Sequence, residues 1–106
     1  VLLGMGKIGN IRVLSEAAVR IGTSNILPKT VDLAGSWVEG QGFGAGGRVV
    51  GKAYGWGGAA GTAAFADFET GLRAGFFTQY MPSEAYPIQG EFPDLVRKDL
   101  AAKTNG

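Results

Sequence analysis

The stretch from Gly40 to Gly61 constrains the fold most, because ten of its 22 residues are glycine. Glycine loses more backbone entropy on folding than any other residue and disfavours helices, so these glycines argue against a helix. Bulky residues that favour strands are interleaved with them, namely Phe43, Val49, Val50, Tyr54 and Trp56. The stretch therefore predicts strands whose backbone lies close to other backbone.

A β-hairpin is predicted directly after this stretch. Residues 62–68 and 72–80 are rich in apolar and aromatic residues, and residues 69–71 between them end in a glycine that suits the turn. Side chains alternate between the two faces of a strand. Because the second strand carries aromatic residues on both faces, such as Phe76 and Phe77, we expect a central strand that is covered on both sides.

Two helices are predicted, one before the strands and one after them. Ser15 is a good N-cap for a helix over residues 16–21. The second helix is expected to begin at Pro93, after a loop over residues 81–92, because proline suits the first helical position. Its apolar stripe consists of Leu95, Val96 and Leu100, with Arg97 and Lys98 outside it. The order of elements predicts an α+β fold of antiparallel strands with flanking helices.

Composition excludes several classes of function. The chain has no Cys and no His, so it alone supplies no disulfide, zinc site, cysteine nucleophile or histidine base, and no cofactor is indicated. Its 10 Lys and Arg are interspersed with 9 Asp and Glu, without the basic stripe that binds nucleic acid. Its apolar runs are far shorter than a membrane span of about 20 residues. For these two reasons, neither nucleic acid nor a membrane is an expected partner. The missing Cys suits either redox compartment and leaves the localisation open.

The amino-terminal glycines match the pattern Gly-x-Gly-x-x-Gly. Gly4, Gly6 and Gly9 follow Val-Leu-Leu and precede the first predicted helix. Asp32 lies 23 residues after Gly9, which completes the outline of a dinucleotide fingerprint. Pro28 argues against this interpretation, because it lies where the second strand is needed, and no further strand–helix alternation follows. A flexible turn before a capped helix is the plainer interpretation, and a dinucleotide-binding module is kept as an alternative.

Near the end of the glycine-rich stretch, Trp56-Gly57-Gly58-Ala59 leads directly into the predicted hairpin. Without a Cβ at Gly57 and Gly58, a ligand can lie against the strand backbone. Backbone N–H groups in such a place can also stabilise a developing oxyanion. The alternative is structural: Trp56 is a core aromatic residue, and the glycines accommodate it against a neighbouring helix. Composition alone favours the structural alternative.

The run YGWGGAAGT, followed by a hairpin that ends in FFTQYMP, resembles the serine esterases of the β-lactamase and penicillin-binding-protein superfamily. The likeness is to the lipolytic family VIII esterases and to their class C β-lactamase relatives. RVLSEAAVRIGTSNILP resembles the helix and loop of the same family, and GQGFGAGGRVV resembles its glycine-rich strand. The likeness spans residues 5–100, and the Trp-Gly-Gly run is its specific motif.

This resemblance implies site residues. In the family the third active-site element lies on a strand that lines the cleft, as Lys-Thr-Gly or, in esterases, as Trp-x-Gly or His-x-Gly. The resemblance implies that Trp56, Gly57 and Gly58 form this element and bind the substrate. It further implies that the backbone N–H of Ala59 is an oxyanion-hole donor, and that Trp56 shapes the acyl or alcohol pocket.

The family's nucleophile is missing. No serine of this chain is followed by lysine three residues later, and no tyrosine forms Tyr-x-Asn. We therefore expect residues 1–106 to be the carboxy-terminal segment of a single β-lactamase/transpeptidase-like domain. A second polypeptide would supply the nucleophilic serine, the lysine and the tyrosine. The whole would cleave a small carboxylic ester through an acyl-serine intermediate, with a β-lactam amide as an alternative substrate.

Overall fold

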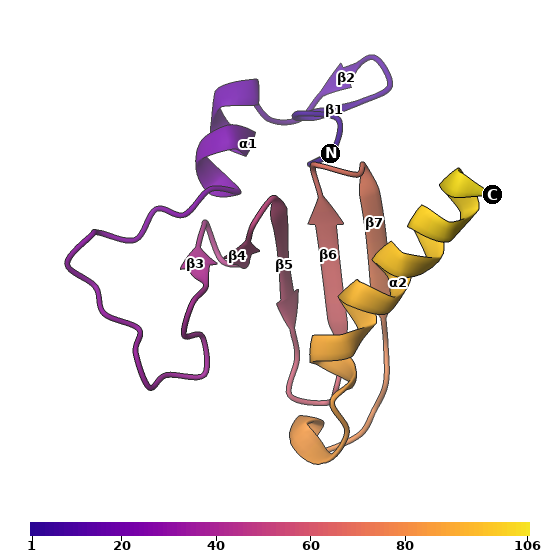
Figure 1. Ribbon diagram of the computed structural model, residues 1–106. Helices are drawn as coiled ribbons and strands as arrows, with labels where there is room; N and C mark the ends of the chain where they lie inside the picture. Colours follow the sequence, from indigo (N-terminus) through magenta and orange to yellow (C-terminus); the bar gives the residue numbers. More distant parts are fainter. The chain divides into compact units, whose positions relative to one another are not determined.

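The computed structural model describes all 106 residues and shows a small α+β fold with two antiparallel sheets and two α-helices (Figure 1). The elements in chain order are β1 (Lys7–Ile8), β2 (Ile11–Arg12), α1 (Glu16–Gly22), β3 (Gly42–Phe43), β4 (Arg48–Val50), β5 (Ala53–Gly57), β6 (Ala63–Asp67), β7 (Leu72–Phe76), the 3₁₀ turn η1 (Ser83–Ala85) and α2 (Ile88–Asn105). The predicted α+β class with antiparallel strands is confirmed.

The chain forms two compact units. Unit 1 contains Val1–Gly55 and Ala66–Leu72, and unit 2 contains Trp56–Phe65 and Arg73–Gly106. Neither helix combines the length and the apolar character that crossing a bilayer requires. The candidate site residues Trp56 to Ala59 all belong to unit 2.

In unit 1 the amino-terminal glycines form the turns of a small β-hairpin. β1 pairs with β2 so that Ile8 lies opposite Ile11, and Gly9 in the turn between them has a φ of +55°. Gly6 has a φ of +95°, and a Cβ there would overlap the carbonyl oxygen of Leu14. Gly4 and Gly6 precede the hairpin, Gly9 lies in its turn, and β2 stands between Gly9 and α1, so the three glycines do not form the strand–turn–helix that binds a dinucleotide's pyrophosphate. The glycines serve this hairpin instead.

Helix α1 forms where the sequence predicts it. The hydroxyl of Ser15 caps the helix by accepting a hydrogen bond of 3.1 Å from the N–H of Ala18. Arg20 donates a hydrogen bond of 2.6 Å to Glu16 one turn earlier, and both side chains are exposed. This hydrogen bond and the positive charge of Arg20 hold the pKa of the Glu16 carboxyl below its ordinary value. Val19, between Glu16 and Arg20 in the sequence, is the buried residue of this helix.

The glycine-rich stretch forms β3, β4 and β5, as predicted. These strands pair in sequence order, and Val49 lies opposite Tyr54. Several glycines allow a close approach that a side chain would prevent. A Cβ at Gly44 would overlap the carbonyl oxygen of Gly22, and one at Gly47 would lie 2.7 Å from the ring of Tyr54. The expected contact of glycine with other backbone is confirmed at Gly44.

The predicted hairpin after this stretch is confirmed as β6 and β7, with Gly71 in the turn at a φ of +71°. Two details of the prediction are wrong. The second strand ends at Phe76, because the chain then leaves the ladder and the hydroxyl of Thr78 donates to the carbonyl oxygen of Ala60 at 2.9 Å. The sheet order is β3-β4-β5-β6-β7, so β7 is an edge strand rather than a central one. The side chain of Phe77 just beyond it is 79% exposed.

In unit 2, α2 lies across β6 and β7 (Figure 1), and Phe92 packs against residues of both strands. The ring centroid of Phe92 lies 6.2 Å from that of Phe65 and 5.6 Å from that of Phe76. The guanidinium of Arg97 lies over the ring of Phe65, 5.4 Å from its centroid. The predicted stripe is therefore wrong in two positions: Arg97 belongs to the packed face, and Leu95 is 58% exposed.

Helix α2 begins at Ile88, five residues before the predicted start. Residues 88–92 are thus helical rather than part of a loop. Pro93 takes the sixth helical position, where it has no N–H to donate to the carbonyl oxygen of Gln89. Contacts from the first turns of the helix to distant residues of unit 2 favour this earlier start over the local preference of proline for a first helical position.

Candidate functional site

The Trp-Gly-Gly run lies at the end of β5 and in the turn that follows. Trp56 is on the strand and 44% exposed. The N–H of Gly58 donates to the carbonyl oxygen of Thr62 at 2.9 Å, and the N–H of Gly61 donates back to the carbonyl oxygen of Gly58 at 3.1 Å. Gly61 has a φ of +83°, which glycine adopts without strain. These bonds close a tight turn over residues 58–62, called here the 58–62 turn.

Ala59 lies exposed in the 58–62 turn, and its backbone N–H donates to no group of the protein. An unpaired N–H on a turn held by its own hydrogen bonds is a preorganised donor. By donating a hydrogen bond, it can stabilise the negative charge that develops on a carbonyl oxygen under attack. The structure thus leaves unpaired the N–H that the family resemblance implies as a donor.

The two glycines of the motif make room for protein side chains. A Cβ at Gly57 would lie 3.0 Å from Nε2 of Gln89, and one at Gly58 would overlap the hydroxyl of Thr62. The predicted space above the two glycines is therefore taken by Gln89 and Thr62 in this structure. The structural alternative is wrong for Trp56, whose side chain is exposed rather than part of the core. The exposed indole and the Ala59 N–H are the parts of the motif that remain accessible to a ligand.

Gln89 of α2 fixes the 58–62 turn from the side. Its Nε2 donates hydrogen bonds to the carbonyl oxygens of Gly58 at 2.8 Å and of Thr62 at 2.9 Å. The opposite amide orientation would set oxygen against two carbonyl oxygens, so the hydrogen bonds define which end is nitrogen. Gln89 was not predicted as a site residue, because it lies in the predicted loop over residues 81–92. The helical spacing of Ile88, Gln89 and Phe92 is the signal that points to it.

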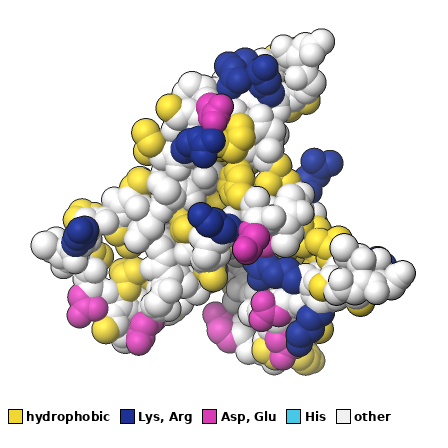
Figure 2. Space-filling view, turned by 45° about the horizontal axis from the view of Figure 1, so that its top comes forward, with side chains coloured by type: hydrophobic (Ala, Val, Ile, Leu, Met, Phe, Trp, Pro, Cys, Tyr) yellow, Lys and Arg dark blue, Asp and Glu magenta, His cyan; other side chains and the backbone are white.

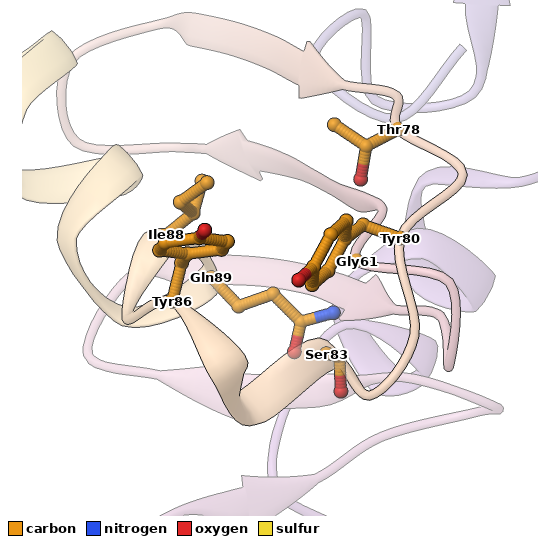
Figure 3. Close-up of a pocket in the computed structure, with 7 residues that line it drawn as sticks. All are labelled: Gly61, Thr78, Tyr80, Ser83, Tyr86, Ile88 and Gln89. Atoms are coloured by element: carbon orange, nitrogen blue, oxygen red, sulfur yellow. The ribbon is translucent and has the colours of Figure 1, made fainter.

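A cavity of about 210 Å³ lies beside the 58–62 turn within unit 2 (Figure 3). We call it the tyrosine pocket; its lining residues are Gly61, Thr78, Tyr80, Ser83, Tyr86, Ile88 and Gln89. The hydroxyl of Thr78 and the N–H of Tyr80 both donate to the carbonyl oxygen of Ala60, at 2.9 and 3.0 Å. The rings of Tyr80 and Tyr86 have centroids 5.3 Å apart and an interplanar angle of 57°. The pocket is therefore joined to the same turn that carries Ala59.

The candidate site is electrically neutral. Neither the residues of the Trp-Gly-Gly run nor those that line the tyrosine pocket carry a formal charge. Figure 2 shows basic and acidic side chains mixed over the face that it displays. No three acidic side chains gather closely enough to hold a metal ion. The site offers the unpaired backbone N–H of Ala59, an exposed indole, a fixed amide and a small neutral cavity.

The structure brings Trp56, Gly57, Gly58 and Ala59 together at one strand end and adds Gln89 to them. The amino-terminal glycines, by contrast, lie in and before the β1–β2 hairpin. No protein-family model matches the chain, and no curated protein sequence matches it either.

Proposed function

We propose that this chain is part of a serine hydrolase that cleaves carboxylic esters. The observation that carries the proposal is the unpaired N–H of Ala59, exposed in a turn directly after Trp56-Gly57-Gly58. In the proposed reaction this N–H donates to the oxyanion, and the indole of Trp56 forms part of the wall for the acyl or alcohol group. Esters with small neutral substituents suit a site that carries no formal charge.

The serine that attacks the ester comes from a second polypeptide, together with the lysine and tyrosine that transfer protons. The serine oxygen adds to the ester carbonyl and loses its proton to this pair. The tetrahedral intermediate then expels the alcohol, which takes up that proton, and water hydrolyses the remaining acyl-serine. The Ala59 N–H stabilises the negative charge in both tetrahedral steps without forming a covalent bond.

Exposed apolar side chains support the need for a second polypeptide. Sixteen large hydrophobic residues are exposed, whereas four hydrophobic residues, of which Val19 and Val38 are the largest, are buried. Most of the large apolar side chains that these two groups contain therefore lie outside the buried core. In the proposal, part of this surface packs against the polypeptide that carries Ser-x-x-Lys, and together they form a β-lactamase/transpeptidase-like domain with this chain as its carboxy-terminal segment.

The proposal is tested by removing the Ala59 N–H. Ala59→Pro deletes this donor, so hydrolysis of p-nitrophenyl butyrate by the complex should fall by about 10²- to 10³-fold. Ala59→Ser keeps the N–H and should retain activity. Ala60→Pro introduces the same ring one residue later while leaving the Ala59 donor in place, and its activity should stay within a few-fold of the parent. Equal losses in Ala59→Pro and Ala60→Pro would contradict the role of this N–H.

The division of roles is tested separately by covalent labelling. A serine-directed fluorophosphonate should label the second polypeptide and leave this chain unmodified, as read by the intact mass of each. A label on Ser15, Ser24, Ser36 or Ser83, the serines of this chain, would show that the nucleophile has been assigned to the wrong polypeptide.

A further inference from the structure

The tyrosine pocket has no part in the hydrolysis proposed above, yet its walls are held by specific bonds. Thr78 and Tyr80 both donate to the carbonyl oxygen of Ala60, which fixes the chain after β7 against the 58–62 turn. Gln89 fixes the first turn of α2 against the same turn. Because protein groups alone hold these walls, a ligand meets a site that is already formed and needs little ordering.

The size and charge of the pocket limit what it can take. Its volume is about 210 Å³. An engineered apolar cavity of roughly 150 Å³ binds benzene, so this pocket has room for one aromatic ring with a small substituent. No lining residue is charged, and a charged ligand would lose its hydration without gaining a partner. The occupant is therefore a neutral molecule with a single ring.

The pocket also contains a fixed hydrogen-bond acceptor. Both amide hydrogens of Gln89 are used by the carbonyl oxygens of Gly58 and Thr62, whereas its Oε1 accepts no hydrogen bond from the protein. Figure 3 shows the amide nitrogen directed toward Gly61 and the oxygen toward Ser83. Since Gln89 cannot turn over without losing both bonds, its oxygen presents a constant acceptor to a ligand that carries an O–H.

We propose that the tyrosine pocket binds a neutral, single-ring aromatic alcohol of the phenol class. The ring packs against the angled rings of Tyr80 and Tyr86, and the hydroxyl donates to Oε1 of Gln89. This binding requires neither a nucleophile nor a second polypeptide. It can therefore hold or fail independently of the proposed ester hydrolysis.

In the first test, the ¹⁵N-labelled 106-residue chain is titrated with phenol, and the amide chemical shifts are measured by NMR at each step. Saturable shifts are expected in residues 58–62 and 78–89. Toluene has the same ring without the hydroxyl and should bind about threefold to tenfold more weakly, which is the loss expected for one neutral hydrogen bond. Shifts that grow linearly without saturation would overturn the proposal, and so would toluene binding as tightly as phenol.

Variants locate the site. Tyr86 is 55% exposed, so Tyr86→Ala removes one wall with little effect on the core, and phenol binding should weaken about tenfold. Tyr86→Phe keeps the ring and should bind phenol as the parent does. Phe77→Ala removes a still more exposed aromatic ring outside the pocket and should also leave binding unchanged. Unchanged binding in Tyr86→Ala, or an equal loss in Phe77→Ala, would overturn the proposal. The phenol–toluene comparison needs no variant to fold.

Discussion

The side-chain Nε2 of Gln89 lies 2.9 Å from the carbonyl oxygen of Thr62, although the two residues are 27 positions apart in the sequence. A second hydrogen bond of 2.8 Å joins the same nitrogen to the carbonyl oxygen of Gly58. These two bonds attach α2 to the turn that carries Ala59. A helix distant in the sequence therefore helps to position the donor on which the proposed function depends.

Replacing Gln89 with leucine should destabilise the protein by about 1–3 kcal/mol, because two hydrogen bonds are lost at a net 0.5–1.5 kcal/mol each. The free energy of unfolding in urea measures this loss. Gln79→Leu is the matched control: this exposed glutamine makes no such bonds, and its replacement should change stability by less than about 0.5 kcal/mol. Equal effects of the two replacements would show that the Gln89 bonds contribute nothing.

Gln89→Glu should be more harmful than Gln89→Leu at neutral pH, because the introduced carboxylate faces two carbonyl oxygens. These oxygens raise the pKa of the introduced carboxyl in the folded state above its value in the unfolded state. The folded variant therefore binds the proton more tightly than the unfolded one. The loss of stability of Gln89→Glu relative to Gln89→Leu should be complete above the folded pKa and should shrink as the pH falls through it. Urea unfolding of both variants from neutral to acidic pH measures the difference. If the difference between the two free energies of unfolding did not change with pH, the side chain at position 89 would not face the two carbonyl oxygens.

Two glycines near this contact should respond to alanine in opposite directions. A Cβ at Gly57 would lie 3.0 Å from Nε2 of Gln89 and 3.2 Å from the carbonyl oxygen of Thr62, so Gly57→Ala should destabilise by about 1–3 kcal/mol through overpacking. A Cβ at Gly90 in α2 would meet no atom within 4 Å. Gly90→Ala should therefore stabilise the protein by about 0.5–1 kcal/mol through helix propensity. The midpoint temperature of thermal unfolding should fall for Gly57→Ala and rise for Gly90→Ala. A shift in the same direction for both would contradict the different surroundings described for the two glycines.

Local signals explain which elements the sequence could predict. Helix α1 could be predicted from Ser15 and the residues after it, because the N-cap and the Glu16–Arg20 ion pair both join residues that are three or four positions apart. The glycine-rich strands are similarly predictable, because many glycines exclude a helix wherever they lie. The amino-terminal glycines were ambiguous, since the same pattern suits a hairpin and a phosphate-binding loop.

The errors concern contacts between residues that are far apart in the sequence. The start of α2 was predicted at Pro93 from a local preference, but Gln89 and Phe92 are held in the helix by residues of β6, β7 and the 58–62 turn. The position of β7 at the edge of the sheet also depends on the order of the strands. This order cannot be predicted from the alternation of side chains along one strand. The Trp-Gly-Gly run was recognisable, whereas Gln89 became visible as a neighbour of Gly57 only in three dimensions.

Phe92 should be the main apolar anchor of α2. Its ring contacts those of Phe65 and Phe76, and Phe92→Ala removes both contacts. Because Phe92 is half-buried, the expected loss is about 2–3 kcal/mol, at or below the lower end of the range for a fully buried phenylalanine. Leu95→Ala, one turn along on the exposed side, should cost less than about 0.5 kcal/mol. Urea unfolding measures both, and a larger loss at Leu95 would show that the packed face has been assigned wrongly.

The ion pair of α1 predicts how the helix responds to pH. Arg20 donates to Glu16 and lowers the pKa of that carboxyl in the folded state relative to the unfolded state. The pair therefore supports the helix fully above the unfolded pKa of Glu16, and this support is lost as the pH falls through the lower, folded pKa. A ¹³C NMR titration of the Glu16 carboxyl should give a pKa below its ordinary value, and Arg20→Gln should raise it. Added salt should reduce the difference between parent and variant, because both side chains are exposed. The same pKa in parent and variant would show that the pair does not form in solution.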